Sequence, residues 1–483
     1  MLRNFFSASF FLITSISFSQ NIPLIHSGEV ITKGKSLKDS SKYAEAIKEF
    51  LKVPERDTNY VYMLSEVTSA YLGTKEYDKV LSICEQQLTK PSHYAPVFLR
   101  HRAAAYDKSG QFDKAVAAFD DAIKKYPADY DLLFDLGITY YNHKNYEQAA
   151  AVFFKVISLY PFHAGSHLNL GRMAIGQGRK VHAMFSFGIY LNISNSDNAR
   201  LVLLNNFLDN QVTDEGSLPL FGTNEPEKLD QIIRAKIAMD KNFKSVIPVD
   251  AAVVRQYEML FQQLNSIQYN TADPWISAYY PIYKFVKDNN LVEPFIYHLL
   301  NSSANTTAKK WLSKNSKALT SFFQSVNVNM KQQREVVSFP ALGFSKPVHA
   351  WYDSQNKLEA LGDIRDDKVR QGHWNFFHDN FQLSAAGDYN EKGIKTSVWK
   401  YYNDDGTIVI EPRPQEKDPE LVAQQALSIC AGSVESRSGR TVQVDADTIC
   451  IHGDRPNAVA IATHVRDALA KGDIAITPIG ALV

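Results

Sequence analysis

Apolar and small residues recur along residues 27–195 with a period of 34 or 35 residues. One position is aromatic in four units and Lys in the fifth: Tyr43, Tyr77, Phe112, Tyr146 and Lys180. Three residues later comes a small or β-branched residue: Ala46, Val80, Ala115, Ala149 and Ala183. Seven residues later comes an apolar residue: Phe50, Cys84, Phe119, Phe153 and Phe187. Because spacings of three, four and seven fall on one face of a helix, the pattern predicts successive pairs of amphipathic helices.

Each predicted helix pair should end at a helix-breaking residue and should depend on adjacent pairs to bury its apolar stripe. Pro127 and Pro161 end the second helix of two units, since proline lacks the amide donor and clashes with the preceding turn. One pair cannot bury its apolar stripe alone, so the units must stack into a curved array. The pattern resembles tetratricopeptide repeats, four to five of them over 27–195. The resemblance implies an α–α superhelix whose groove holds a protein or peptide partner.

A run of charged residues lies on the first helix of one repeat: Arg100, His101, Arg102, Asp107 and Lys108. These side chains either line the predicted groove or form a solvated helix face, and the second interpretation is favoured for each one taken singly. The pattern therefore assigns no binding residue among them.

Residues 196–340 keep helical spacing but lose the period. Amphipathic segments are expected at 227–240, 251–264 and 289–300, separated by prolines, with a polar loop at 302–307. Terminal repeats of such arrays diverge because they cover an apolar end. We therefore expect an irregular helical extension here.

A second repeat follows at residues 346–411. Trp351, Trp374 and Trp399 lie 23 and 25 residues apart, and Gly362 and Gly387 lie 25 apart. Alternating aromatic residues followed by Asn, Asp and Gly predict successive β-hairpins, with a turn at 403–406. The segment resembles MORN-like repeats. Its aromatic residues are expected to form the core of a narrow sheet, the alternative being a platform that faces a ligand.

The composition changes abruptly after residue 411. Every Trp, Tyr and Phe precedes Pro412, and the 72 residues from 412 to 483 contain none. The run from Ala446 to Asp454 and the helix expected after it resemble the C-terminal end of the LamB/YcsF family, the A-type subunits of 5-oxoprolinase. Such a break indicates a junction between sequences of different origin, through natural fusion or through an assembly join.

That resemblance implies an enzymatic activity, but the matching segment corresponds to only part of a family member. Family members are cytoplasmic, distorted β/α barrels that hydrolyse 5-oxoproline to glutamate with ATP and two partner subunits. The acidic opening and the middle strands of the family are absent here. A stretch of about 70 residues cannot close a barrel that takes about 250. The sequence thus predicts a short α/β fragment at 412–483.

Two residues of the fragment are candidate catalytic groups. Strands are expected at 441–444 and 448–451 and a helix at 457–470, which places His452 and Asp454 just beyond a strand end. An imidazole and a carboxylate there can relay a proton during ring opening. The competing interpretation is a turn in which Asp454 caps the helix ahead of Pro456, and the residue pattern alone favours it.

The N-terminus has the order of a secretory signal. Arg3 is its lone charge, an apolar run from Phe5 to Ile16 follows, and Ser17 and Ser19 precede the expected cleavage before Gln20. The run is shorter than the 20 or so residues that span a bilayer. We expect a signal peptide at 1–19 and an exported chain without a transmembrane segment, in the periplasm or secreted.

Charge and composition exclude several other classes. Lys+Arg and Asp+Glu are equal at 52 each, so no basic excess favours nucleic acid. The 3 cysteines do not make a zinc cage or a disulfide framework, and no cofactor or metal motif occurs. The predicted fold is mainly α, a tetratricopeptide-type superhelix with further helices, a small antiparallel β-hairpin module and a C-terminal α/β fragment. The predicted function is an exported scaffold for protein or peptide partners rather than an enzyme. The alternative is a hydrolase similar to the A-type subunits of 5-oxoprolinase, with ATP and partner subunits in the cytoplasm.

Overall fold

The structure is a computed structural model that divides into two compact units, Met1–Thr407 and Ile408–Val483, each described by itself. It describes residues 26–194, 196–208, 218, 229–231, 233, 245–270, 272–332, 335–336, 342–346, 348–354, 357–365, 368–396, 399–409, 418–435, 441–444, 449, 451 and 457–477. The signal peptide predicted at 1–19 lies outside these residues. Among the described helices, none combines the length and the apolar character needed to cross a membrane.

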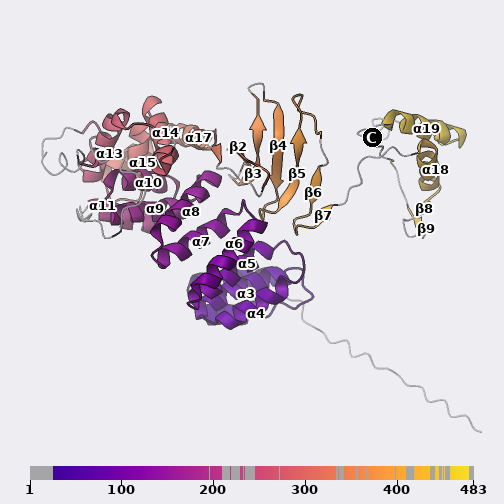
Figure 1. Cartoon of the computed structure of the whole chain (residues 1–483), viewed down its shortest axis with the longest axis horizontal. Coiled ribbons are helices and arrows are strands. Elements are labelled where there is room, and N and C mark those ends of the chain that lie inside the picture. Colours follow the sequence, from indigo (N-terminus) through magenta and orange to yellow (C-terminus); the bar gives the residue numbers. More distant parts are fainter. Residues whose placement is uncertain are drawn as a thin grey trace, which may run out of the picture. The chain divides into compact units, whose positions relative to one another are not determined.

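Ten consecutive helices form five pairs in the first unit, as the 34-residue period predicts (Figure 1). The first helices of the pairs are α1 (Ser27–Asp39), α3 (Tyr60–Thr74), α5 (Ala95–Lys108), α7 (Tyr130–Asn142) and α9 (Ala164–Gly176). The second helices are α2 (Tyr43–Phe50), α4 (Tyr77–Gln87), α6 (Phe112–Lys125), α8 (Tyr146–Leu159) and α10 (Lys180–Ile193). The turn inside each pair holds one residue with positive φ: Ser41, Lys75, Gly110, Lys144 and Gly178. The predicted succession of helix pairs is confirmed.

The helices of a pair approach closely where the first helix carries glycine. A Cβ atom at Gly137 of α7 would lie 2.6 Å from the ring of Phe153 of α8. Two other pairs show the same close approach: an added Cβ atom would lie 2.3 Å from the Phe50 ring at Gly34 and 2.4 Å from the Phe187 ring at Gly171. These phenylalanines occupy the seventh position of the sequence pattern and are buried. Small and large residues therefore interlock at each crossing.

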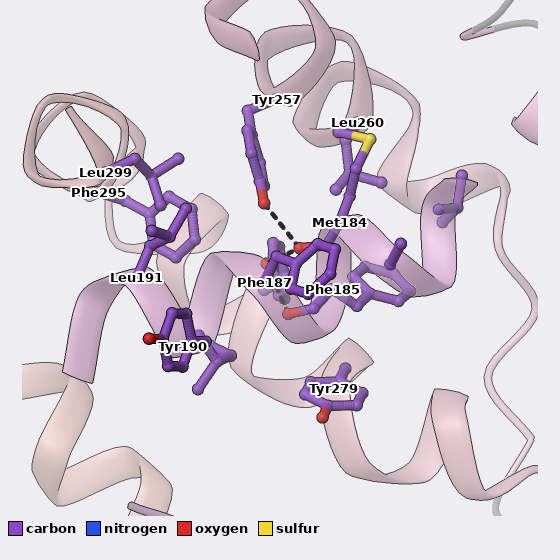
Figure 2. Close-up of a cluster of buried hydrophobic side chains, with 14 of the residues drawn as sticks. Met184, Phe185, Phe187, Tyr190, Leu191, Tyr257, Leu260, Tyr279, Phe295 and Leu299 are labelled. Carbon is purple, nitrogen blue, oxygen red and sulfur yellow. Dashed lines mark hydrogen bonds between the residues drawn. The ribbon is translucent and has the colours of Figure 1, made fainter. Parts of the chain in front are cut away.

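The last helix of the array is buried all round by the extension that follows. Every residue from Val181 to Asn192 of α10 is buried. The helices of the extension are α11 (Asp197–Leu208), α13 (Ala252–Gln263), η1 (Leu264–Ser266), α14 (Pro274–Asp288), α15 (Val292–Leu299), α16 (Thr306–Lys314) and α17 (Ser316–Gln332). Of these, α14 and α15 pack directly on α10. The hydroxyl of Tyr257 donates to the Met184 carbonyl at 2.8 Å inside this cluster. Figure 2 shows both residues and this bond. The segments predicted at 251–264 and 289–300 are confirmed as α13 and α15, and most of the segment at 227–240 lies outside the described residues.

The hairpin repeats form an antiparallel sheet whose strand order follows the sequence (Figure 1). Its strands are β1 (Glu335–Val336), β2 (Val348–Tyr352), β3 (Leu358–Ile364), β4 (Arg370–Phe377), β5 (Leu383–Tyr389) and β6 (Lys400–Tyr402), with β7 (Ile408–Val409) at the division between the units. One face of the sheet packs on α7 and α8, where Val348, Ala350 and Phe377 share a core with Leu133 and Leu159. The β-hairpin module is confirmed, and the resemblance to MORN-like repeats stays a prediction.

Beyond β7, the described residues of the second unit form two packed helices and a hairpin. These are α18 (Pro419–Cys430), β8 (Ser433–Glu435), β9 (Thr441–Gln443) and α19 (Ala458–Lys471). Ala423 and Ala426 of α18 pack on Ile461, Val465 and Leu469 of α19. The strand at 441–444 and the helix at 457–470 are confirmed within one residue at each end.

The strand predicted at 448–451 is not formed at its two described residues, Ile449 and Ile451. A barrel strand is held by hydrogen bonds to neighbouring strands, and a fragment of this length supplies few. The hydrogen bonds of β9 go instead to β8, in an antiparallel hairpin that the sequence pattern did not predict.

Candidate functional site

The first helices of the repeats form an extended candidate surface in the first unit. Successive first helices pack directly on one another, α1 on α3, α3 on α5 and α5 on α7. We call their shared solvent side the first-helix face. It is defined by Lys38 of α1, Glu66 of α3, Arg100, His101 and Asp107 of α5, and Asp131, Asp135 and His143 at α7. In stacked helical repeats, such a surface is where partners bind.

Polar contacts tie each first helix to the next across this face. Lys38 pairs with Glu66, which joins α1 to α3. Thr68 Oγ1 of α3 lies 2.7 Å from His101 Nδ1 of α5. Further along α5, Asp107 Oδ1 lies 2.8 Å from Nε2 of His143, at the end of α7. The face is therefore held by side chains from adjacent repeats.

Arg100 is the centre of this network. Its Nε donates to Asp135 Oδ2 at 2.9 Å and its Nη1 donates to Asp131 Oδ2 at 3.1 Å. Burial acts to lower the pKa of Arg100, but the charges of Asp135, Asp131 and Asp129 outweigh it and raise that pKa above its ordinary value. One guanidinium thus bridges two carboxylates of the next repeat.

Asp129 caps α7 beside this cluster and is buried. Its Oδ1 accepts hydrogen bonds from the amides of Asp131 and Leu132 at 2.9 and 3.0 Å. Burial raises the pKa of Asp129 to about 7, and the charge of Asp131 also raises it. Burial likewise lowers the pKa of His101 to about 3 and of His163 to about 4. The imidazole of His101 is therefore neutral at pH 7 and adds no positive charge to the first-helix face.

The charged run on α5 was expected either to line a groove or to form a solvated helix face, and the structure matches neither expectation in full. Arg100, His101 and Asp107 are partly exposed but are bound to neighbouring helices, so they are neither a freely solvated face nor unpaired groups for a ligand. Lys108 is exposed and ends α5, directly after Asp107 of the same face. Arg102 is half-buried, and among the described residues its Nε has no hydrogen-bond partner.

The sheet holds a second arrangement of chemically active groups. His373 Nδ1 lies 2.9 Å from Asp388 Oδ1, and His349 Nδ1 lies 2.7 Å from Asp363 Oδ1. A pocket of about 470 Å³ beside His373 is lined by Phe344, Asp363 and Tyr389 among others. A carboxylate can orient an imidazole for proton transfer, but the described lining residues include no Ser, Thr or Cys to act as a nucleophile.

The catalytic candidates of the tail, His452 and Asp454, lie outside the described residues, so their roles stay predictions. Asn457, at the start of α19, is the described residue nearest to them on the helix side. Within the described ranges no three His, Cys, Asp or Glu side chains gather in a way that could hold a metal ion. Burial raises the pKa of Cys84 to about 12, which keeps that thiol protonated.

Sequence reasoning missed the contacts between distant segments. Nothing in the pattern paired Arg100 with Asp131 and Asp135, although their separations of 31 and 35 residues match one repeat length. The sequence signal that could have predicted these ion pairs is the presence of opposite charges about one repeat length apart. The packing of the sheet on α7 and α8 had no comparable signal.

Comparisons with known proteins find two families in different parts of the chain. Residues 102–164 match the model of the tetratricopeptide repeat family. Residues 394–483 match the model of the LamB/YcsF family. The second match begins before the composition boundary at 412 and includes β6 and β7.

The curated relatives are similar to the C-terminal part alone. The chain is 39% identical over 82 residues to the A-type 5-oxoprolinase subunit of Thermococcus onnurineus, which is 16% of this chain and 32% of that protein. It is 42% identical over 76 residues to an A-type 5-oxoprolinase subunit of Pseudomonas syringae, covering 15% and 30%. With the Thermus thermophilus protein of the same name it is 47% identical over 60 residues, covering 12% and 24%. The chain spans about a third or less of the length of these relatives.

Proposed function

We propose that this protein is an exported scaffold that binds a protein or peptide partner along the first-helix face. The main support is the ladder of contacts through Lys38, His101, Arg100 and Asp107, which joins the first helices of four repeats into one surface. Because these side chains are already paired, the surface needs little reorganisation when a partner binds. The tetratricopeptide match at 102–164 includes α7 and most of α5, two of the helices that form this surface.

Site-specific photocrosslinking on the full chain tests the binding surface. A photoreactive residue at Lys108 replaces an exposed lysine beside the first-helix face. The matched control is Lys124, an exposed lysine on α6, the second helix of the same repeat, which pairs with Asp121 of its own helix. We expect a partner to crosslink at 108 and not at 124. Equal crosslinking at both positions, or none at either, contradicts the proposal.

Export is part of this proposal and has its own test. It rests on the order of Arg3, the apolar run and Ser17 and Ser19 in the sequence. Mass spectrometry of the protein from the host's extracytoplasmic fraction should find an N-terminus at Gln20. A chain that keeps Met1 in the cytoplasmic fraction refutes export.

A second candidate function is supported by the match of residues 394–483 to the LamB/YcsF family. Under it, the C-terminal unit would contribute to ATP-dependent hydrolysis of 5-oxoproline to glutamate, in the cytoplasm and together with partner subunits. His452 and Asp454 would be its catalytic groups.

Glutamate release from 5-oxoproline and ATP, with the full chain and both partner subunits, tests this candidate. His452→Ala should abolish the release. His464→Ala is the matched control, because His464 is an exposed residue of α19 whose Nδ1 contacts its own helix, at the Ala460 carbonyl. No glutamate from the unmodified chain, or no difference between the two variants, removes the enzyme from consideration.

A further inference from the structure

The sheet of the first unit carries large apolar or aromatic residues on both faces. Ala350 and Phe377 lie in the core against α7 and α8. Their chain neighbours Trp351 and Phe376 point to the other face, because successive residues of a strand alternate. An antiparallel sheet with one face on a core usually presents polar residues on the other. The second face therefore departs from the usual pattern.

Six aromatic rings form a continuous layer on that second face, which we call the aromatic face: Trp351, Trp374, Phe376, Tyr389, Trp399 and Tyr401. Trp351 stacks on Trp374 with ring centres 5.7 Å apart, and Trp374 stacks on Phe376 at 5.6 Å. The layer continues through Phe376 to Trp399 at 6.1 Å and from Trp399 to Tyr401 at 6.3 Å. Trp374 is only 2% exposed and supports the layer, whereas the other five rings keep part of their surface in solvent.

The tryptophans are held against the backbone of neighbouring strands. A Cβ atom at Gly362 would lie 2.3 Å from Trp374, and one at Gly387 would lie 2.6 Å from Trp399. The indole nitrogens donate inward, Trp351 to the Gly362 carbonyl at 3.1 Å and Trp399 to the Asp388 carbonyl at 3.3 Å. With its polar edge turned to the backbone, each ring presents carbon to a ligand.

Two cations lie on this layer at equivalent positions of the repeat. Arg370 lies four residues before Trp374, with its guanidinium 4.8 Å from that ring, and Lys395 lies four before Trp399, with its ammonium 4.2 Å from that ring. Both are exposed. Each donates one hydrogen bond to a tyrosine hydroxyl, Arg370 to Tyr389 and Lys395 to Tyr401.

The two cations keep their charge available for a ligand. In the part of the protein that the structure describes, neither Arg370 nor Lys395 forms an ion pair with a carboxylate. An arginine has five N–H donors and a lysine three, so both keep donors for a ligand. The aromatic face thus offers two positive charges, 25 residues apart in sequence, among flat carbon surfaces.

We propose that the aromatic face binds an acidic polysaccharide, a linear polymer of carboxylated sugars. The C–H faces of sugar rings pack on the exposed rings of Trp351, Trp399 and Tyr401, and sugar carboxylates pair with Arg370 and Lys395. Sparse charge favours this occupant over single-stranded nucleic acid, which requires a continuous positive groove along its backbone. The proposal is independent of partner binding on the first-helix face.

Affinity electrophoresis of the full chain tests the proposal. Gels containing polygalacturonate, a polymer of one carboxylated sugar, should retard the protein, and gels containing the neutral polymer dextran should not. The double variant Arg370→Gln with Lys395→Gln keeps all six rings and should weaken polygalacturonate binding at least tenfold.

The control variant is Lys114→Gln with Lys124→Gln, which removes the same charge from exposed positions of α6 and should bind like the unmodified protein. Near-ultraviolet circular dichroism verifies that the tryptophan layer is intact in both variants. Absence of retardation, equal retardation in dextran, equal weakening by the two variants, or tighter binding to a thirty-residue oligothymidine than to polygalacturonate each overturns the proposal.

Discussion

The hydroxyl of Tyr352 on β2 donates a hydrogen bond to the carbonyl of Leu159, the last residue of α8, at 2.6 Å. The two residues are 193 positions apart in the sequence. The bond satisfies a carbonyl at the end of a helix, where the helix itself offers no amide partner. The sheet is thereby fixed to the fourth repeat.

Removing this hydroxyl should loosen the sheet from the solenoid. Tyr352→Phe keeps the ring and deletes the donor, and we expect it to lower the free energy of unfolding of the first unit by about 1 kcal/mol. Urea denaturation followed by circular dichroism measures the change. Tyr402→Phe on β6 is the control, since no hydrogen bond of its hydroxyl is found in the described part of the chain. Equal effects of the two substitutions would show that the bond contributes nothing.

An added side-chain atom where α7 crosses α8 should destabilise the folded protein. Gly137→Ala places a Cβ 2.6 Å from the Phe153 ring, and overpacking of this kind costs about 1 to 3 kcal/mol. Gly28→Ala in α1 is the matched control, because no atom of the described residues lies within 4 Å of its added Cβ. Alanine favours a helix over glycine by up to about 1 kcal/mol, so the control should be neutral or slightly stabilising. Thermal unfolding distinguishes the two, and a stable Gly137→Ala protein would contradict the interlocked crossing.

The buried cap Asp129 should make stability depend on pH. Its pKa is raised to about 7 in the folded protein, against about 4 for an ordinary Asp, so its contribution is complete below pH 4 and is lost as pH rises through 7. Asp129→Asn keeps an acceptor for the amides of Asp131 and Leu132 but does not ionise. Relative to the unmodified protein, this variant should gain stability as pH rises from 4 to 8, by at most about 1.4 kcal/mol per pH unit. Urea denaturation at several pH values checks this, and parallel pH profiles for the two proteins would refute it.

Arg100 should be hard to replace even by lysine. Its planar group reaches Asp131 and Asp135 together, which a single ammonium does less well. We expect Arg100→Lys to cost about 1 kcal/mol and Arg100→Ala about 1 to 3 kcal/mol, because alanine leaves two carboxylates without their cation. Arg56→Ala, at an exposed position, should change stability by less than about 0.5 kcal/mol. Chemical denaturation in one buffer compares all three, and indistinguishable values would mean that the network is not structural.

The helix pairs were predictable because the residues that define each buried stripe lie close together in the sequence. Ala149 and Phe153 mark the buried stripe of α8 within a few residues of each other, and the same spacing returns in every repeat. The prolines of 196–340 were expected to separate helical segments, yet one of them, Pro274, begins α14, which is capped by Asp273. Aspartate followed by proline at the first helical position is a start signal, so this boundary was available in the sequence.

The arrangement of the candidate surfaces was not predictable to the same degree. The charged residues of α5 could be identified, but which of them face α3 and which face α7 depends on how one helix is rotated against the next. The aromatic residues of the hairpins were expected to form a core or a platform. They divide instead, with Phe377 in the core against the helices and Trp351 and Trp399 on the other face.

Trp374 and Trp399 each rest on a glycine of the strand just before them, and the strands follow one another in chain order. On this face, each of the two rings is supported by the strand just before it. Such a module can lengthen or shorten during evolution by duplication or loss of whole hairpins. The number of hairpins in related sheets should therefore vary more freely than the residues within each one.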